Sequence, residues 1–359
     1  MNPIVSRSTD FARRYDLPLP ILMAPMAGAC PPELAHAVVQ GGGMGACGAL
    51  LETPAGIGQW VARFEALGGG PLLINLWVPD PEPVRDAAHE AAVRDFLAQF
   101  APRSPDDAIA RLSLQSFDDQ FEAIVAARPA VFSTIMGLPG DEQVARLKAA
   151  GIAWFATVTT LADALAAEAA GADAVVVQGA EAGGHRGAFD PARAVDEAVG
   201  LFALLPIVCD AVRVPVVASG GIADARGVAA ALVLGASAVQ IGTGLLRTPE
   251  AGIAPGWARG IAAARPESTR ISRAVSGRPG RSLATDYVAR AASADAPSPL
   301  PYPLQRALTA NLRKQALLED DLQRMQAWCG QAAALARDRP AASLVADTWA
   351  QARALLPAA

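Results

Sequence analysis

One loop of the sequence combines residues suited to acid–base chemistry with residues that let a ligand approach the backbone. Residues 174–178 read Ala-Val-Val-Val-Gln, and Gly-Ala-Glu-Ala-Gly-Gly-His-Arg-Gly follows at 179–187. Such an apolar run is typical of a buried strand in a parallel sheet, and α/β barrels hold their active sites just after such strands. His185 can act there as a general base or as an anion partner, or it can be an ordinary structural histidine. Arg186 either assists with its charge or lies at the surface.

Two glycine-rich strand ends indicate a phosphate site. Ser219-Gly-Gly-Ile222 and Gln240-Ile-Gly-Thr243 each follow an apolar run. TIM barrels commonly bind phosphate after their seventh and eighth strands, through backbone N–H groups and a helix N-terminus. Ala24-Pro25-Met26, Asn75 and Gln178 end three other predicted strands and offer backbone and amide groups to a planar ring. Together these residues predict a site for flavin mononucleotide (FMN).

The elements that position these residues alternate between short apolar strands and amphipathic helices. Expected strands are 20–25, 44–49, 72–77, 130–136, 153–158, 174–179, 215–221 and 238–243. Expected helices are 32–41, 54–67, 117–127, 141–150, 161–170, 195–212 and 224–234. Thr53-Pro54 is typical of a capped helix start, and Gly151, Gly171 and Gly235 of helix ends. Eight β/α units predict an α/β protein with a (β/α)8 TIM barrel; a doubly wound sheet is the alternative.

Two segments do not follow this alternation, and they predict the domain organisation. Residues 1–244 form the barrel with the FMN site, interrupted after strand three by an insertion at about 79–115 that holds a helix near 86–100. Residues 245–323 form an additional, mostly helical lid domain over the substrate, because the strand pattern stops there. Residues 324–359 return as C-terminal helices that pack on the barrel.

The composition excludes several classes of protein. The chain has 359 residues, 52% of them hydrophobic, and a net charge of −5, which argues against a nucleic-acid partner. No apolar run approaches the roughly 20 residues that span a bilayer. The N-terminus also lacks the pattern of a signal peptide, so we expect a cytoplasmic protein that does not bind membranes. The four scattered cysteines indicate neither a disulfide framework nor a metal site.

Two chemistries common in α/β proteins are also disfavoured. The two lysines, Lys148 and Lys314, do not lie at predicted strand ends, so Schiff-base aldolase chemistry has no nucleophile. Gly43-Met-Gly-Ala-Cys-Gly48 fits the G-x-G-x-x-G pattern. However, it follows a predicted helix and overlaps a strand, whereas a dinucleotide fingerprint follows a strand and opens a helix.

Taken together, these motifs resemble the nitronate monooxygenase family, formerly called 2-nitropropane dioxygenases. The resemblance covers most of the chain and rests on Ala24-Pro25-Met26, residues 178–187, Ser219–Ile222, Gln240–Thr243, Ser276-Gly-Arg-Pro279 and the tail at 328–337. The Glu-Ala-Gly-Gly-His core is shared with flavin-dependent enoyl-acyl-carrier-protein reductases and a related quinone reductase. After Asn75, many relatives carry an aromatic pair followed by Cys-His. This chain has Leu76-Trp77-Val78-Pro79 there, beside the expected substrate pocket.

The resemblance implies an FMN-dependent oxidoreductase that oxidises alkyl nitronates, such as propionate 3-nitronate, with O2 to a carbonyl compound and nitrite. It implies that His185 is catalytic and that the flavin faces Ala24, Pro25, Met26, Asn75, Gln178, Gly183, Gly220, Gly221, Gln240, Gly242 and Thr243. Two alternatives stay open: an NAD(P)H-dependent flavin reductase of the related reductase types, and a flavin-binding protein without turnover. The physiological substrate and the oligomeric state also stay open.

Overall fold

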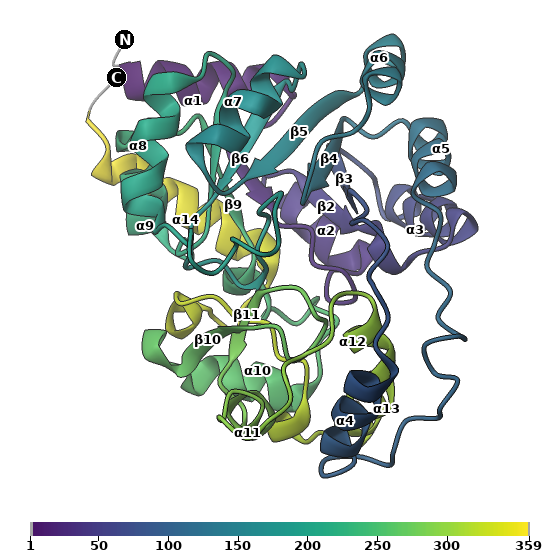
Figure 1. The fold of residues 1–359 in the computed structure, drawn as a ribbon. Coiled ribbons are helices and arrows are strands. Elements are labelled where there is room, and N and C mark those ends of the chain that lie inside the picture. The colour runs from purple at the N-terminus through teal and green to yellow at the C-terminus, as the bar shows by residue number, and fades with distance from the viewer. Residues whose placement is uncertain (1–2, 358–359) are drawn as a thin grey trace.

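Eight parallel strands form a barrel in the upper of two lobes (Figure 1). The computed structural model describes residues 3–357. The strands are β1 (Ile21–Met23), β2 (Gly45–Gly48), β3 (Leu72–Trp77), β4 (Val131–Ile135), β5 (Ala153–Val158), β6 (Ala174–Gln178), β8 (Val216–Ser219) and β9 (Ala238–Ile241). They pair in the order β1-β9-β8-β6-β5-β4-β3-β2, and a bridge between Leu22 and Met44 brings the two ends of this order together. The predicted (β/α)8 TIM-barrel fold is therefore confirmed.

Helices cover the outside of the barrel (Figure 1). They are α1 (Pro3–Arg14), α2 (Pro32–Gln40), α3 (Pro54–Ala66), α5 (Phe117–Ala127), α6 (Asp141–Ala149), α7 (Leu161–Ala169), α8 (Leu201–Ala211), α9 (Ala225–Val233) and α14 (Ala341–Leu355). Their apolar faces join the buried strands in one hydrophobic core. The predicted start of α3 is confirmed, because the Thr53 hydroxyl accepts a hydrogen bond from the Gly56 N–H (2.9 Å).

The structure corrects several predicted element ends. β3, β5 and α5 have the predicted bounds. β8 ends at Ser219, two residues early, because Gly220 and Gly221 have φ angles of +107° and +69° and leave the extended conformation. The helix predicted at 195–212 begins only at Leu201, and residues 191–197 form turns instead. α1 forms at the N-terminal end of the described chain, where no element is predicted.

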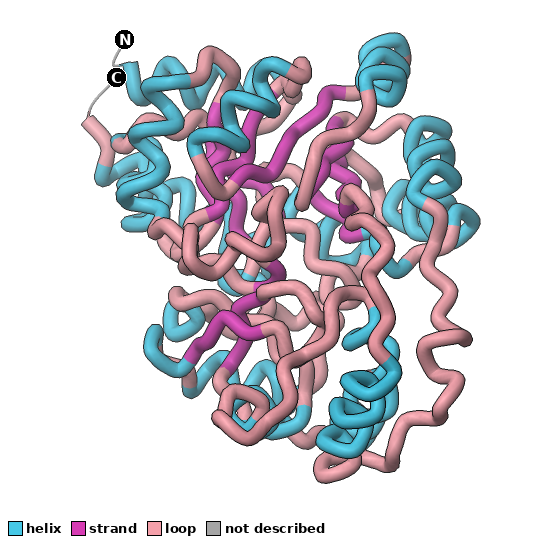
Figure 2. Tube along the Cα trace, in the orientation of Figure 1, coloured by secondary structure: helices cyan, strands magenta, loops and turns pink. Residues whose placement is uncertain are grey.

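The lower lobe combines two separate stretches of the chain (Figure 1). A second hydrophobic cluster joins Val93 and Phe96, from the 79–115 insertion, to Tyr287, Leu304 and Leu308. The lobe also contains strands that the sequence pattern does not predict, and Figure 2 shows them in magenta at the left of this lobe. Its main elements are α4 (Ala87–Leu97), α10 (Pro255–Ala263), β10 (Thr269–Ser272), β11 (Gly280–Leu283), α11 (Asp286–Arg290), α12 (Leu304–Leu308) and α13 (Ala310–Leu318). The boundaries at 244 and 323, and the lid role, stay predictions.

A two-residue strand connects the lobes. β7 (Gly184–His185) follows the barrel strand β6 in the chain, yet it pairs with β11 of the lower lobe, with His185 opposite Gly280. β11 pairs in turn with β10, so the three strands form a small antiparallel sheet. His185 thus lies at the junction of the two lobes.

The C-terminal helix α14 contacts α2 and α9 of the barrel. The contact is close: a Cβ atom at Gly41, at the end of α2, would lie 2.6 Å from the carbonyl oxygen of Ala342. Single 3-10 turns complete the chain at η1 (Ala49–Leu51), η2 (Thr243–Leu245), η3 (Pro266–Ser268), η4 (Leu322–Arg324) and η5 (Ala333–Leu335). Among residues 3–357, no helix has both the length and the apolar character needed to cross a membrane.

Candidate active site

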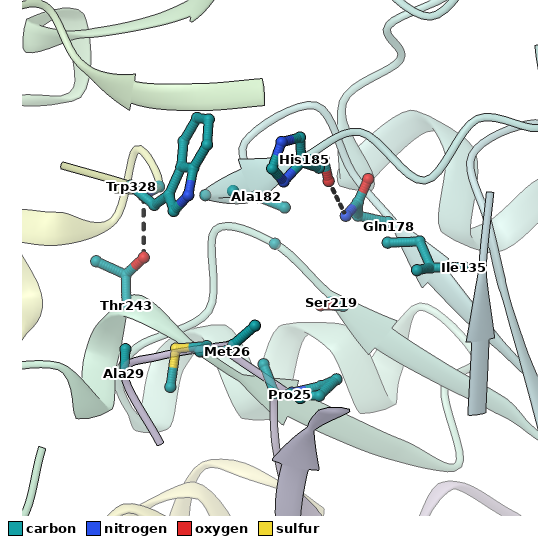
Figure 3. Close-up of a pocket in the computed structure, with 18 of the residues that line it drawn as sticks. Pro25, Met26, Ala29, Ile135, Gln178, Ala182, His185, Ser219, Thr243 and Trp328 are labelled. Atoms are coloured by element: carbon teal, nitrogen blue, oxygen red, sulfur yellow. Dashed lines mark hydrogen bonds between the residues drawn. The ribbon is translucent and has the colours of Figure 1, made fainter. Parts of the chain in front are cut away.

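A cavity lies between the carboxyl ends of the barrel strands and the lower lobe. Figure 3 shows Pro25 and Met26 on one side, here called the floor, and His185 and Trp328 on the opposite side, here called the roof. The structure brings all the residues predicted from the sequence to this cavity. They are Ala24, Pro25, Met26, Asn75, Gln178, Gly183, His185, Gly220, Gly221, Gln240, Gly242 and Thr243.

Hydrogen bonds of the backbone hold the floor in place. The Ala24 N–H donates to the carbonyl of Ile241 at the end of β9 (2.8 Å). The buried Cys30 thiol donates to the Met26 carbonyl (3.0 Å) and accepts from the Met26 N–H (3.3 Å). A Cβ atom at Gly48 would lie 2.6 Å from the Ala27 nitrogen, so glycine is required there. The result is a small apolar surface.

Gly220 and Gly221 supply backbone groups with no protein partner. Neither residue makes a hydrogen bond within residues 3–357, and both line the cavity. Two N–H groups in the first turn of α9 are already satisfied, because Asp224 accepts from the N–H groups of Arg226 (3.1 Å) and Gly227 (3.2 Å). An anion at this end of the cavity would therefore bind the N–H groups of the glycine turn, and not those of the helix terminus.

Two of the three predicted amide side chains, those of Asn75 and Gln178, are already oriented by the protein. Asn75 Nδ2 donates to the carbonyl (3.1 Å) and the hydroxyl (2.8 Å) of Ser133. Gln178 Nε2 donates to the carbonyl of His185 (3.0 Å), and its Oε1 accepts from the Gly187 N–H (2.9 Å). Gln178 thus ties the end of β6 to the loop that carries His185.

His185 is enclosed by aromatic rings. Its ring centroid lies 4.5 Å from that of Trp77 and 4.6 Å from that of Trp328. Trp77 in turn contacts Tyr302 (5.4 Å). The imidazole Nε2 lies 2.7 Å from the hydroxyl oxygen of Ser276, a buried residue in the turn between β10 and β11.

Burial, together with the charges around His185, keeps its imidazole neutral. Burial, followed by repulsion from Arg278 and Arg306, lowers the pKa of His185 to about 3. Arg278 is paired with Asp80 of the insertion, with Nε 2.7 Å from Oδ2. Arg306 lines the cavity, and its guanidinium has no hydrogen-bond or ion-pair partner among residues 3–357. Its pKa is lowered by burial, so the cation is incompletely solvated.

Two features of the His185 loop differ from their sequence interpretation. At Gly183, the close neighbour is the C-terminal tail: a Cβ atom there would lie 2.5 Å from the Gly330 nitrogen. Arg186 is not at the surface. It is buried, and its guanidinium donates to the carbonyls of Gly179 (2.6 Å) and Gln178 (3.3 Å), which fixes the end of β6.

The roof contains residues that sequence reasoning did not assign to the site. Trp328 belongs to the tail motif, but its spacing gives no sign that it reaches His185. Tyr302 and Arg306 lie in a stretch without recognisable pattern, and only the fold brings them to the cavity. Among residues 3–357, no group of three or more His, Cys, Asp or Glu side chains could hold a metal ion.

A parallel barrel with polar side chains and open backbone groups gathered at its carboxyl ends defines a (β/α)8-barrel enzyme. Comparisons with known proteins then identify the family. The family model "Nitronate monooxygenase" covers residues 13–350. The chain belongs to the nitronate monooxygenase family and is an oxidoreductase.

Individual relatives agree with this assignment. A nitronate monooxygenase from Paraburkholderia phytofirmans is 40% identical over 333 residues, which are 91% of this chain and 90% of the relative. The structure of a nitroalkane oxidase from Streptomyces ansochromogenes is 36% identical, with a TM-score of 0.86, over 96% of this chain and all of that one. FabK from Thermotoga maritima is 27% identical, with a TM-score of 0.76, over 96% of each chain.

Proposed function

We propose that the protein oxidises alkyl nitronates, such as propionate 3-nitronate, with O2 to a carbonyl compound and nitrite, using FMN held in the cavity. The observation that carries the proposal is the contrast between the two sides of the cavity. The floor is apolar and ends at the open N–H groups of Gly220 and Gly221. The roof presents the neutral His185 beside the Arg306 cation.

The lining residues fit FMN in shape and chemistry. The apolar floor of Ala24–Met26 suits the face of a planar ring, and the glycine turn at 220–221 suits a phosphate. Asn75 and Gln178 each have one amide group left to hydrogen-bond a polar ring edge. In Asn75 it is the Oδ1 acceptor, and in Gln178 it is the second N–H of Nε2. Gly183, Gln240, Gly242 and Thr243 would complete the cradle. When bound, FMN would accept electrons from the nitronate and pass them to O2.

The roof residues would bind and orient the nitronate. Arg306 supplies positive charge without a protein counter-ion, which favours an anionic substrate. Trp77, Tyr302 and Trp328 surround the reacting region with apolar surface and limit its access to water. His185 would hydrogen-bond a nitronate oxygen. A neutral nitroalkane would need a base, and the low pKa of His185 makes its imidazole a weak one.

Anaerobic titration of the purified protein tests the proposal. Adding propionate 3-nitronate should bleach the oxidised flavin absorbance, and admitting O2 should restore it and release nitrite. Mass spectrometry of the ligand released on denaturation should identify FMN. A flavin that propionate 3-nitronate leaves oxidised would overturn the proposed reaction, and the adenine dinucleotide would overturn the phosphate assignment.

One observation favours a second candidate. The Glu-Ala-Gly-Gly-His core at 181–185, shared with the flavin-dependent reductases, frames the cavity, so NAD(P)H-dependent reduction of an enoyl thioester or a quinone is the alternative. A parallel anaerobic titration with NADH separates the two activities. Bleaching by NADH and not by the nitronate would favour the reductase, and bleaching by neither would favour a flavin-binding protein without turnover.

We further propose a cytoplasmic location and small-molecule partners only. The four cysteines are free thiols, as is usual in a reducing compartment. The net charge of −5 argues against nucleic acid. Fractionation of cells that express the tagged chain tests the location.

A further inference from the structure

The contact between His185 and Ser276 decides which imidazole nitrogen carries the proton. Ser276 is 1% exposed, and its hydroxyl oxygen lies 2.7 Å from His185 Nε2. The same oxygen accepts from the Arg278 N–H (3.3 Å) and lies 3.4 Å from the Arg278 carbonyl. The hydroxyl has one proton to donate, so it can serve His185 or the Arg278 carbonyl, but not both.

The other imidazole nitrogen, Nδ1, is the accessible one. Nδ1 has no hydrogen-bond partner within residues 3–357, and it is not sealed inside the protein. His185 lines the cavity on the roof side (Figure 3). Any ligand that hydrogen-bonds the ring must therefore do so through Nδ1.

Two arrangements follow, and they give His185 opposite roles. If Nε2 donates to Ser276, Nδ1 carries a lone pair, and His185 can act as a base toward the ligand. If Ser276 donates to Nε2, Nδ1 carries the proton and His185 offers a hydrogen-bond donor. We propose that Ser276 is a positioning residue that donates to His185 Nε2 and thereby fixes an Nδ1–H donor toward a nitronate oxygen. This inference rests on the proposed nitronate substrate.

The geometry favours the donor arrangement. The 2.7 Å contact is a strong hydrogen bond, whereas the competing contact with the Arg278 carbonyl at 3.4 Å is weak. The Arg278 N–H, by donating to Ser276, also polarises the hydroxyl and makes it a better donor.

The charges near the ring act in the same direction. Arg278 and Arg306 both oppose a positive charge on His185. The carboxylate of Asp80 is engaged by Arg278, and the Tyr302 hydroxyl is neutral because burial raises its pKa. A base at this position would have to become an imidazolium among cations, while a neutral donor to an anion gains from the same field.

Nuclear magnetic resonance of the FMN-loaded protein labelled with 15N-histidine tests the assignment directly. The chain has three histidines, and loss of one set of signals in His185→Gln identifies His185. The expected result is a neutral ring protonated at Nδ1. A ring protonated at Nε2, or an imidazolium, between pH 6 and 8 would overturn the proposal. This readout needs no substrate, so it stays informative even if nitronate oxidation itself fails.

A pair of serine variants tests the role of the hydroxyl. Ser276→Ala removes the proposed donor, and Ser282→Ala removes an equally buried hydroxyl that donates to the Leu283 carbonyl in neighbouring β11. We expect only Ser276→Ala to shift His185 away from the Nδ1–H form. We also expect it to lower kcat/KM for the nitronate about tenfold to hundredfold, as for a lost hydrogen bond to a charged group. An unchanged tautomer in Ser276→Ala, with flavin retained, would contradict the proposal.

Discussion

The indole of Trp328, from the C-terminal tail, packs against the imidazole of His185, with ring centroids 4.6 Å apart and planes inclined by 58°. Backbone hydrogen bonds on either side hold this contact in place. The Gln331 N–H donates to the Glu181 carbonyl (2.9 Å), and Trp328 forms an antiparallel β-bridge with Ser282. The tail is therefore a wall of the candidate site as well as a support for the barrel.

Shortening Trp328 should impair turnover more than folding. In Trp328→Ala, the imidazole loses one of its two flanking rings, and we expect kcat/KM for the nitronate to fall about tenfold to hundredfold through misorientation. Trp328→Phe keeps a ring at this position and should retain most activity. Steady-state kinetics with circular dichroism give the answer. Equal kinetics for the Ala and Phe variants would show that the ring does not orient His185.

Gly183→Ala should destabilise the protein by displacing the tail. The new Cβ would lie 2.5 Å from the Gly330 nitrogen and 2.7 Å from the Cys329 carbonyl carbon. Overpacking of this kind costs about 1–3 kcal/mol of unfolding free energy. Gly58→Ala is the matched control, since a Cβ there meets nothing within 4 Å in α3 and should add about 0.5–1 kcal/mol. Urea unfolding measures both, and a neutral Gly183→Ala would refute the tail contact.

Gly242→Val should weaken flavin binding more than the fold. A Cβ at Gly242 would lie 3.2 Å from the Ala24 Cβ and 3.6 Å from the Met26 sulfur, so the larger valine pushes into the floor of the cavity. We expect the Kd for FMN to rise by at least about tenfold, with unchanged circular dichroism. Gly252→Val, outside the cavity and exposed, is the control. Loss of secondary structure in parallel with flavin would assign Gly242 to the fold instead.

His185 should make the protein less stable as the pH falls. The pKa of His185 is lowered to about 3 in the folded protein, whereas it is about 6.5 in an unfolded chain. At a pH between these two pKa values, His185 is protonated in the unfolded chain but not in the folded protein. The unfolded state is therefore stabilised relative to the folded state as the pH drops below about 6.5. We expect the Tm of the parent protein to fall more steeply from pH 7.5 to 5 than that of His185→Asn. Parallel curves would mean that His185 titrates normally.

The sequence allowed the fold, the floor of the site and His185 of the roof to be predicted, but not the other roof residues. Val175, Val176 and Val177 mark a buried parallel strand by residue type alone, and parallel strands bring their carboxyl ends to one edge. This is why residues as distant as Ala24, Asn75 and Gly242 could be assigned to one cavity. The β10–β11 pair was missed because 269–283 lacks apolar alternation, and because the other partner of β11, the two-residue strand β7, lies far away in the chain.

The remaining roof residues reach the cavity through tertiary contacts, and such contacts leave no pattern in the local sequence. The ring of Trp328 and the cation of Arg306 reach the cavity from segments whose composition gives no sign of it. Their positions depend on the packing of the lower lobe, which is determined by distant partners such as Phe96 and Leu308.

The two-part construction of the lower lobe also affects the order in which the chain can fold during synthesis. Val93 and Phe96 leave the ribosome long before Leu304 and Leu308, with which they share a hydrophobic cluster. At about 5–20 residues per second, the roughly 200 residues between them take on the order of 10–40 seconds to make. For most of that interval the apolar face of α4 lacks its partners from the later part of the chain, such as Tyr287, Leu304 and Leu308, while the barrel strands can already pair. Chaperone demand should therefore concentrate on this early insertion, and a chain released before residue 304 should expose it permanently.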